Sequence, residues 1–138
     1  MSGLKQTDPE IYNLIQEELL RQRITQKDFL RDYEFIFALD GLKAMELITT
    51  NPDIEIALLD INMPKMDGLT LLGKIPDINP IMRTIMLSAY GDMNNIRTAM
   101  NLGAFDFITK PIDMNDLELT IKKTIEEVKQ VKEMMLKQ

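Results

Sequence analysis

The stretch LLDINMPKMDG, residues 58–68, decides the fold. An apolar run over residues 54–59 ends at a single carboxylate, Asp60, and a loop rich in Asn, Pro, Asp and Gly follows at once. Parallel α/β sheets bind their ligands outside the carboxyl ends of the strands. The stretch therefore predicts a buried strand that presents Asp60 as a reactive group where the chain turns away from the sheet.

The composition excludes several classes of site. The 138 residues carry a net charge of −6 and contain neither Cys nor His. Disulfides, the common zinc sites and His-based general bases are therefore excluded. Lys and Arg are scattered, which predicts no nucleic-acid-binding face, and no apolar run approaches the roughly 18 residues of a membrane span. These features predict one acidic, cytoplasmic domain with its own core.

From residue 33 onward, predicted strands alternate with predicted helices. Strands are expected over residues 33–38, 54–60, 81–87 and 105–109. Helices are expected over residues 42–49, 69–75, 94–102 and 114–137. Gly73 and Pro76 should end the second of these helices, Gly103 should close the third, and Asp113 should cap the fourth. The alternation favours βαβ units, a parallel sheet and right-handed crossovers.

The N-terminal segment departs from this alternation. Residues 1–7 show no strand pattern, whereas Asp8, Pro9 and Glu10 favour the start of a helix. We therefore expect an N-terminal helical segment over residues 1–29, a domain over residues 30–126, and an extension of the last helix over residues 127–138.

The last helix carries a second pattern. Apolar or small residues follow a 4-3 spacing at Met114, Leu117, Ile121, Thr124, Val128, Val131 and Met135. Only the first half of such a helix is needed to cover a sheet. The remainder predicts either helix-mediated association or a linker toward an output domain.

Three polar residues follow successive predicted strands, namely Asp60, Ser88 and Lys110. A carboxylate can act as a nucleophile, while an ammonium and a hydroxyl can hold phosphoryl oxygens. A divalent cation normally neutralises charge in such a transfer, and Asp60 and the backbone carbonyl of Asn62 are hard ligands for it. Each residue alone is more often a turn former or a solvated group, so the prediction of a phosphoryl site depends on all three occurring together.

Three motifs closely resemble the receiver domains of bacterial two-component response regulators over residues 30–126. They are LLDINMPKMDG, LSAYGD at residues 87–92, and GAFDFITKPID at residues 103–113. The resemblance implies an α/β, doubly wound, flavodoxin-like fold. It also implies a signalling phosphoacceptor, not an enzyme with a separate substrate, that receives phosphate from a histidine kinase, a phosphotransfer protein or a small donor.

The resemblance assigns roles to individual residues. Asp60 is implied as the phosphoacceptor, with Lys110 as the lysine that contacts the phosphate. Ser88 is implied as the switch hydroxyl and Phe107 as the switch aromatic residue. The backbone carbonyl of Asn62 is implied as a ligand of Mg²⁺.

The N-terminus lacks the first strand of that pattern, which ends in adjacent acids that complete the Mg²⁺ site. Gln6 and Thr7 stand where these acids belong, and Asp8 and Glu10 are the nearest carboxylates. A missing central strand would leave backbone groups unpaired at about 1–3 kcal/mol each. We therefore expect the first strand to be missing, replaced or supplied by another chain, in a homodimer or swapped assembly.

Residues 4–23, LKQTDPEIYNLIQEELLRQR, resemble the N-terminal helical arm of serine hydroxymethyltransferases, without that family's cofactor-binding or catalytic parts. The chain is then either a chimera or contains an ordinary amphipathic helix. Two functions stay open, a Mg²⁺-dependent phosphoacceptor and a receiver-derived scaffold that folds and self-associates without phosphorylation. An unrelated flavodoxin-like cofactor binder would need a glycine-rich phosphate loop, which the sequence lacks.

Overall fold

A computed structural model describes residues 21–23, 34, 36, 38, 40–62 and 65–137. The chain divides into two compact units, Met1–Leu39 and Asp40–Gln138. In the first unit residues 21–23 are helical, within the predicted N-terminal helical segment. Of the strand predicted over residues 33–38, only Glu34, Ile36 and Ala38 are described, and these three belong to no helix or strand. The prediction that the first strand is missing, replaced or supplied by another chain concerns residues that the structure does not describe.

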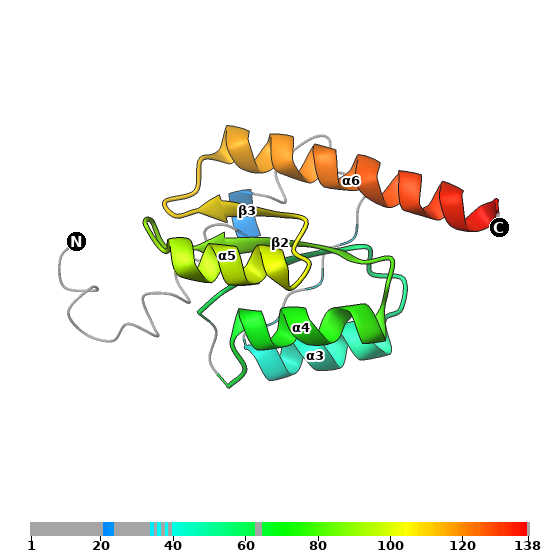
Figure 1. Ribbon diagram of the computed structural model, residues 1–138, viewed down its shortest axis with the longest axis horizontal. Helices are drawn as coiled ribbons and strands as arrows, with labels where there is room; N and C mark the ends of the chain where they lie inside the picture. The colour runs from blue at the N-terminus through cyan, green and yellow to red at the C-terminus, as the bar shows by residue number, and fades with distance from the viewer. Residues whose placement is uncertain are drawn as a thin grey trace. The chain divides into compact units, whose positions relative to one another are not determined.

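The described part of the second unit contains a parallel sheet of three strands in the order β1–β2–β3 (Figure 1). The strands are β1 (Ile56–Asp60), β2 (Arg83–Ser88) and β3 (Asp106–Thr109). The register pairs Asp60 with Leu87 and Ser88 with Thr109. The carboxyl ends of the strands therefore lie side by side, as the predicted βαβ units require.

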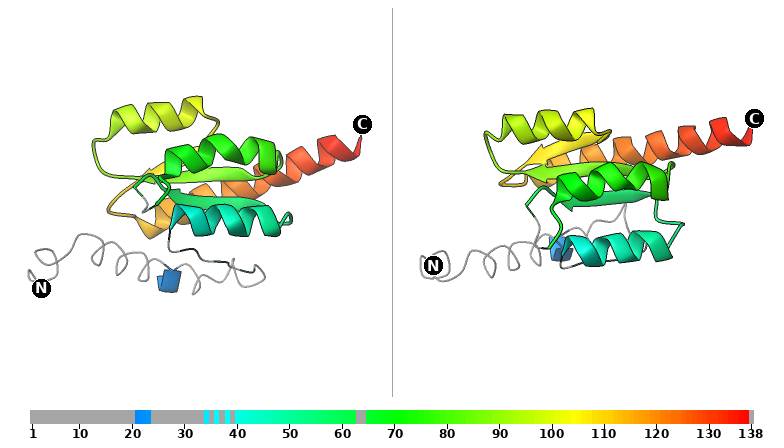
Figure 2. Two further views of the ribbon diagram at one scale, coloured as in Figure 1. Left: turned by 90° about the horizontal axis from the view of Figure 1, so that it is seen from below. Right: turned by 60° about the horizontal axis from the view of Figure 1, so that its bottom comes forward.

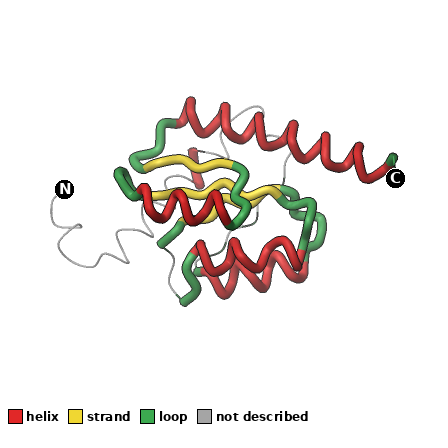
Figure 3. The backbone as a smooth tube through the Cα atoms, in the orientation of Figure 1, coloured by secondary structure: helices red, strands yellow, loops and turns green. Residues whose placement is uncertain are grey.

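Three of the described helices in this unit each follow a strand, one helix precedes β1, and helices cover the sheet on both faces. They are α3 (Gly41–Thr50), α4 (Gly68–Ile78), α5 (Met93–Asn101) and α6 (Met114–Leu136). α4 contacts β1 and α5 contacts β2, while α6 crosses all three strands from the other side (Figures 1 and 2). Figure 3 shows how each strand leads through a loop into a helix. None of the described helices is long and apolar enough to cross a membrane.

The central strand β2 forms the middle of the core. From its second residue onward every residue of β2 is buried, with Ile85 and Met86 at 0% exposure. A strand that is covered on both faces by helices is expected to be continuously apolar, which explains why the sequence there shows no alternation. α6 seals one face with Leu117 and Ile121, and each such buried side chain contributes about 1.5–3 kcal/mol.

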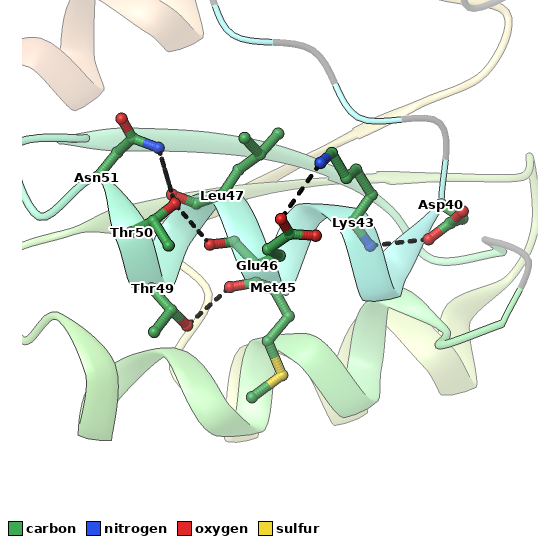
Figure 4. Close-up of polar contacts among 8 residues, drawn as sticks. All are labelled: Asp40, Lys43, Met45, Glu46, Leu47, Thr49, Thr50 and Asn51. Atoms are coloured by element: carbon green, nitrogen blue, oxygen red, sulfur yellow. Dashed lines mark hydrogen bonds and ion pairs between the residues drawn. The ribbon is translucent and has the colours of Figure 1, made fainter.

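Side chains cap both ends of α3 (Figure 4). Asp40 accepts a hydrogen bond from the N–H of Lys43 at 2.8 Å. The side-chain amide of Asn51 donates to the carbonyl of Leu47, also at 2.8 Å. These bonds satisfy backbone groups that a helix leaves unpaired at its ends. The helix predicted over residues 42–49 is confirmed, with one more residue at each end.

α4 continues beyond its predicted end. The helix runs to Ile78 with Pro76 inside it, so the prediction that Gly73 and Pro76 end it was wrong. A proline removes one backbone hydrogen bond and costs about 3 kcal/mol in a helix interior. Buried side chains on α4, among them Leu72 and Ile75, contribute about 1.5–3 kcal/mol each and outweigh that loss.

α6 begins as predicted, because the side chain of Asp113 accepts a hydrogen bond from the N–H of Asn115 at 2.8 Å. The buried face of the helix ends at Val128, and the following turns carry an exposed Met135 and Leu136. Most of the heptad-spaced residues thus pack against the sheet, and only the last turns of that pattern present apolar side chains to the surroundings.

Candidate functional site

Asp60 and Lys110 form an ion pair at the carboxyl end of the strands. Asp60 is the last residue of β1 and only 8% exposed, whereas Lys110 follows directly after β3. The ammonium of Lys110 contacts Oδ2 of Asp60. Because β2 lies between β1 and β3, the long lysine side chain reaches across the end of β2. Two charges that are distant in the sequence are thus joined over the middle of the sheet.

Ser88 stands at the end of β2, between these two residues. Its side chain is 1% exposed, and its hydroxyl has no hydrogen-bond partner within the described part of the chain. The carbonyl of Ser88 accepts the N–H of Lys110 at 2.8 Å, which fixes the lysine beside the serine. A buried unpaired hydroxyl costs about 1–3 kcal/mol. Such a group in a native structure needs an explanation, and a ligand that binds there would supply the missing partner.

The loop after Asp60 orients the second carboxylate oxygen. The N–H of Asn62 donates to Oδ1 of Asp60 at 3.0 Å. The N–H of Gly68 donates to the carbonyl of Ile61 at 2.9 Å and closes the loop on itself. A Cβ atom at Gly68 would lie 2.2 Å from the carbonyl oxygen of Asp60, so no other residue fits there without displacing the backbone. Both oxygens of Asp60 therefore have a defined partner, Lys110 on one and Asn62 on the other.

Two oxygen groups at this end of the sheet could serve as ligands of a cation. The carboxylate of Asp60 and the carbonyl of Asn62 are hard oxygen ligands of the kind that Mg²⁺ prefers, and this ion usually keeps several waters. In the ranges that the structure describes, no group of three or more His, Cys, Asp or Glu side chains could hold a metal. The predicted additional ligands, Asp8 and Glu10, lie outside these ranges. The donors on this side fit Mg²⁺ in type but do not by themselves complete a site.

Phe107 lies apart from the ion pair, in the middle of β3. It pairs with Met86 of β2 and is half-buried. The neighbouring Asp106 forms an ion pair with Lys123 of α6 at 2.7 Å, and the same ammonium lies 5.6 Å from the ring centre of Phe105. Lys123 of α6 thus contacts both a carboxylate and an aromatic ring in the segment of β3.

Sequence reasoning missed the role of two Asp-Gly pairs. Asp40-Gly41 and Asp67-Gly68 each place an N-cap aspartate before a glycine that begins a helix. Both glycines contact the segment that runs from Asp60 to α4. The repeated Asp-Gly pair is the signal by which both helix starts could have been predicted from the sequence.

Comparisons with known proteins show what the chain is similar to. A family model described as response regulator receiver domain matches residues 14–122. Sporulation initiation phosphotransferase F of Bacillus subtilis (strain 168) is 34% identical over 92 residues, which cover 66% of this chain and 73% of that protein. The transcriptional regulatory protein ZraR of Klebsiella oxytoca is 31% identical over 93 residues, which cover 67% of this chain but only 21% of the regulator.

A solved structure gives the same result for the fold. The crystal structure of a CheY-like response regulator receiver domain protein from Methanospirillum hungatei JF-1 superposes with a TM-score of 0.73 at 29% identity. The superposition covers 83% of this chain and 91% of that one. The predicted doubly wound, flavodoxin-like α/β fold is therefore confirmed.

Proposed function

The chain belongs to the response regulator receiver domain family, whose members act as phosphoacceptors in two-component signalling, and we propose that Asp60 is its phosphoacceptor. The single observation that carries this assignment is the ion pair of the buried Asp60 with the partly exposed Lys110, beside a hydroxyl of Ser88 that has no partner among the described residues. A nucleophile, a fixed positive charge and a free donor at one position are the groups that phosphoryl transfer needs.

In the proposed reaction a carboxylate oxygen of Asp60 attacks the phosphorus of a phosphohistidine or of a small donor such as acetyl phosphate. The new O–P bond forms as the bond from phosphorus to the leaving group breaks. The departing imidazole of a phosphohistidine takes up a proton from water, whereas acetyl phosphate releases acetate. Lys110 then shifts its contact from Oδ2 to a phosphoryl oxygen, and the hydroxyl of Ser88 donates to another. The N–H of Asn62 keeps the carboxylate oriented through Oδ1.

Mg²⁺ is the proposed cofactor, and its chemistry would be to offset the charge of the incoming phosphoryl group. Asp60 and the carbonyl of Asn62 would hold it from the described side. Asp8 and Glu10 are the proposed sources of further oxygen ligands. Ser88 and Phe107 are the proposed switch residues, which would respond once phosphate is in place.

The proposed partners follow from the same chemistry. A histidine kinase or a phosphotransfer protein would supply the phosphoryl group in the cytoplasm. The exposed apolar turns at the end of α6 would contact an output domain or a second copy of the chain, since Met134, Met135 and Leu136 are all exposed. The 21% coverage of the transcriptional regulator supports a separate output function, because that protein extends far beyond the matched receiver.

The direct test is intact-mass measurement after incubation with acetyl phosphate and Mg²⁺. The wild-type chain should gain one phosphoryl group, and Asp60→Asn should gain none. The matched control is Asp53→Asn, which makes the same chemical change at an exposed position and should behave like the wild type. An equal mass gain in Asp60→Asn would exclude Asp60 as the acceptor.

Omitting the metal separates the two functions left open by the sequence. Loss of the mass gain in the presence of a chelator supports Mg²⁺-dependent transfer. If the wild type gains no mass with Mg²⁺ and shows no Mg²⁺ binding in titration, the chain is a receiver-derived scaffold without phosphorylation.

A further inference from the structure

We propose that the start of α3 holds the loop between Asp60 and α4 in place, and thereby positions the carboxylate of Asp60. We call Asp40 and Gly41 the α3 brace. In the loop, they contact Lys65 and Met66. The inference depends on the proposed role of Asp60, because the brace acts on the loop that orients this carboxylate. Asp40 and Gly41 touch no reacting atom, so they are positioning residues and not catalytic residues.

The first contact of the brace is between two backbones. A Cβ atom at Gly41 would lie 1.9 Å from the carbonyl oxygen of Met66 and 2.7 Å from its carbonyl carbon. These are backbone atoms, so no flexible side chain could move aside to make room. Gly41 is buried, and its missing side chain is what allows the start of α3 to lie directly against the loop.

The second contact is an ion pair that shares the cap of the helix. One carboxylate oxygen of Asp40 accepts the N–H of Lys43 at 2.8 Å, as Figure 4 shows. The other oxygen lies 3.5 Å from the ammonium of Lys65. Asp40 therefore caps α3 and holds the loop with the same side chain.

Lys65 itself adopts a conformation that needs support. Its φ is 67°, in the left-handed region that few residues other than glycine occupy. Residues persist in such regions where their surroundings hold them, and they cluster at functional sites. The ion pair to Asp40 and the adjacent contact of Met66 with Gly41 supply that support.

The loop transmits this placement to the carboxylate. Its far end is closed by the bond from the N–H of Gly68 to the carbonyl of Ile61, and its near end carries the N–H of Asn62 that binds Oδ1 of Asp60. Met66 lies between these two hydrogen bonds in the sequence. A displacement of Met66 is therefore expected to shift the N–H of Asn62 relative to Oδ1 and to reorient the carboxylate of Asp60.

Two glycine variants test the brace with the same chemical change. Gly41→Ala should displace the loop, whereas Gly73→Ala on α4 should not, because a Cβ atom there would meet only Leu102 at 4.0 Å. We expect Gly41→Ala to slow phosphorylation by acetyl phosphate about tenfold or more, since a 1 Å misplacement can cost on the order of 100-fold in rate. Gly73→Ala should keep the wild-type rate.

A second measurement separates positioning from a general loss of stability. Amide hydrogen exchange at Asn62 and Gly68 is compared with exchange at Ile85 in the buried strand β2. In Gly41→Ala the two loop amides should exchange faster relative to Ile85, because the loop opens locally. A uniform acceleration at all three amides would mean that the substitution only destabilises the fold, and it would overturn the brace.

Asp40→Asn covers the case in which Gly41→Ala does not fold. Asparagine is as good an N-cap as aspartate, so α3 keeps its cap while the charge that pairs with Lys65 is lost. The exchange rate of the loop amides relative to that of Ile85 should rise as in Gly41→Ala, but by less. Asp53→Asn is the exposed control.

If the wild type gains no phosphoryl group, the proposed role of Asp60 is wrong, but the relative exchange rates still test the α3 brace. Identical ratios in both glycine variants and the wild type would refute it.

Discussion

The two ends of the sheet differ in whether their buried polar side chains have hydrogen-bond partners. Asn79 lies before the amino end of β2, and its side-chain amide donates to the carbonyls of Pro52 at 3.2 Å and Ile54 at 3.0 Å. Its carbonyl oxygen accepts the N–H groups of Ile81 at 3.1 Å and Met82 at 3.3 Å. One buried amide thus joins the connections that lead into β1 and β2, and its hydrogen-bonding capacity is used.

The neighbouring charges at the amino end are paired as well. Arg83 donates to Glu127 of α6 at 3.2 Å and to the carbonyl of Pro80 at 3.0 Å. Lys132, further along α6, reaches Glu55 just before β1 at 2.6 Å. Both ion pairs fasten α6 to the start of the strands.

At the carboxyl end of the strands, the polar side chains are positioned to bind a ligand. Ser88 is buried, yet its hydroxyl has no hydrogen-bond partner in the part of the chain that the structure describes. The partner of Asp60 is a lysine that, in the proposed reaction, moves to a phosphoryl oxygen. At the amino end of the strands, hydrogen bonds and ion pairs stabilise the sheet. At the carboxyl end, the buried hydroxyl of Ser88 is expected to lower the stability. Ligands of parallel α/β sheets bind outside the carboxyl ends of the strands, which is the end where the hydroxyl of Ser88 lacks a partner among the described residues.

Removing the amide at the amino end should have the largest effect. Asn79→Ala removes the side-chain partner of the N–H of Ile81 and of the carbonyls of Pro52 and Ile54, at about 1–3 kcal/mol for each group that stays buried. The N–H of Met82 keeps the backbone carbonyl of residue 79 at 3.3 Å. We expect the free energy of unfolding to fall by about 3 kcal/mol in urea denaturation. Phosphorylation per folded molecule should be unchanged, because the site is at the other end.

The exposed Asn101 provides the control, and Asn101→Ala should leave the free energy of unfolding near the wild-type value. A change below about 1 kcal/mol in Asn79→Ala, or a specific loss of phosphorylation, would break the distinction between the two ends.

Removing the hydroxyl at the carboxyl end should have the opposite sign. Ser88→Ala deletes a buried hydroxyl that has no partner among the described residues, so the free energy of unfolding should stay the same or rise by up to about 1 kcal/mol. Phosphorylation should slow about tenfold, because a hydrogen bond to a charged group contributes about 1.5–3 kcal/mol. Urea denaturation and time-resolved intact mass measure the two effects on the same sample.

Thr124→Val is the matched comparison for Ser88→Ala. The hydroxyl of Thr124 is also buried, but it donates to the carbonyl of Thr120 at 2.6 Å. Its removal should lower the free energy of unfolding by about 1 kcal/mol and leave phosphorylation unaffected. Equal destabilisation by Ser88→Ala and Thr124→Val would mean that Ser88 does have a partner.

The same contrast explains what the sequence could predict. Asp60, Ser88 and Lys110 were recognisable because each directly follows a β-rich run, and a parallel sheet brings strand ends together. Asn79 gave no such signal, because its partners Pro52 and Ile54 lie 27 and 25 residues away. The end of α4 was wrongly predicted at Pro76 for a related reason. The helix continues because its side chains are buried against the rest of the fold, and this tertiary effect is not visible in the local sequence.

The α3 brace was unpredictable from sequence on the same grounds. A glycine after an aspartate favours a turn at that point in the chain, and nothing local indicates that its missing side chain makes room for Met66. Contacts of this kind are set by how the helices approach the loop, so they become visible only in the folded structure.

The smallest predicted effect concerns Asp40, the aspartate that caps α3. The N–H of Lys43 lowers the pKa of Asp40 below its ordinary value of 3.8, and the charge of Lys65 lowers this pKa further, while burial opposes both. The folded state therefore holds its proton less tightly than the unfolded state. The resulting stability is fully present above pH 3.8 and is lost as the pH falls through the lower folded-state pKa.

Asp40→Asn isolates this contribution, because other acids titrate in both proteins and cancel in the difference. The wild type should exceed Asp40→Asn in free energy of unfolding at neutral pH, and the difference should shrink on acidification, as urea denaturation at a series of pH values would show. Lys65→Met should keep most of this pH dependence, because the N–H of Lys43 is the larger cause. A difference that grows as the pH falls would reverse the sign and would mean that the fold gains nothing from this acid.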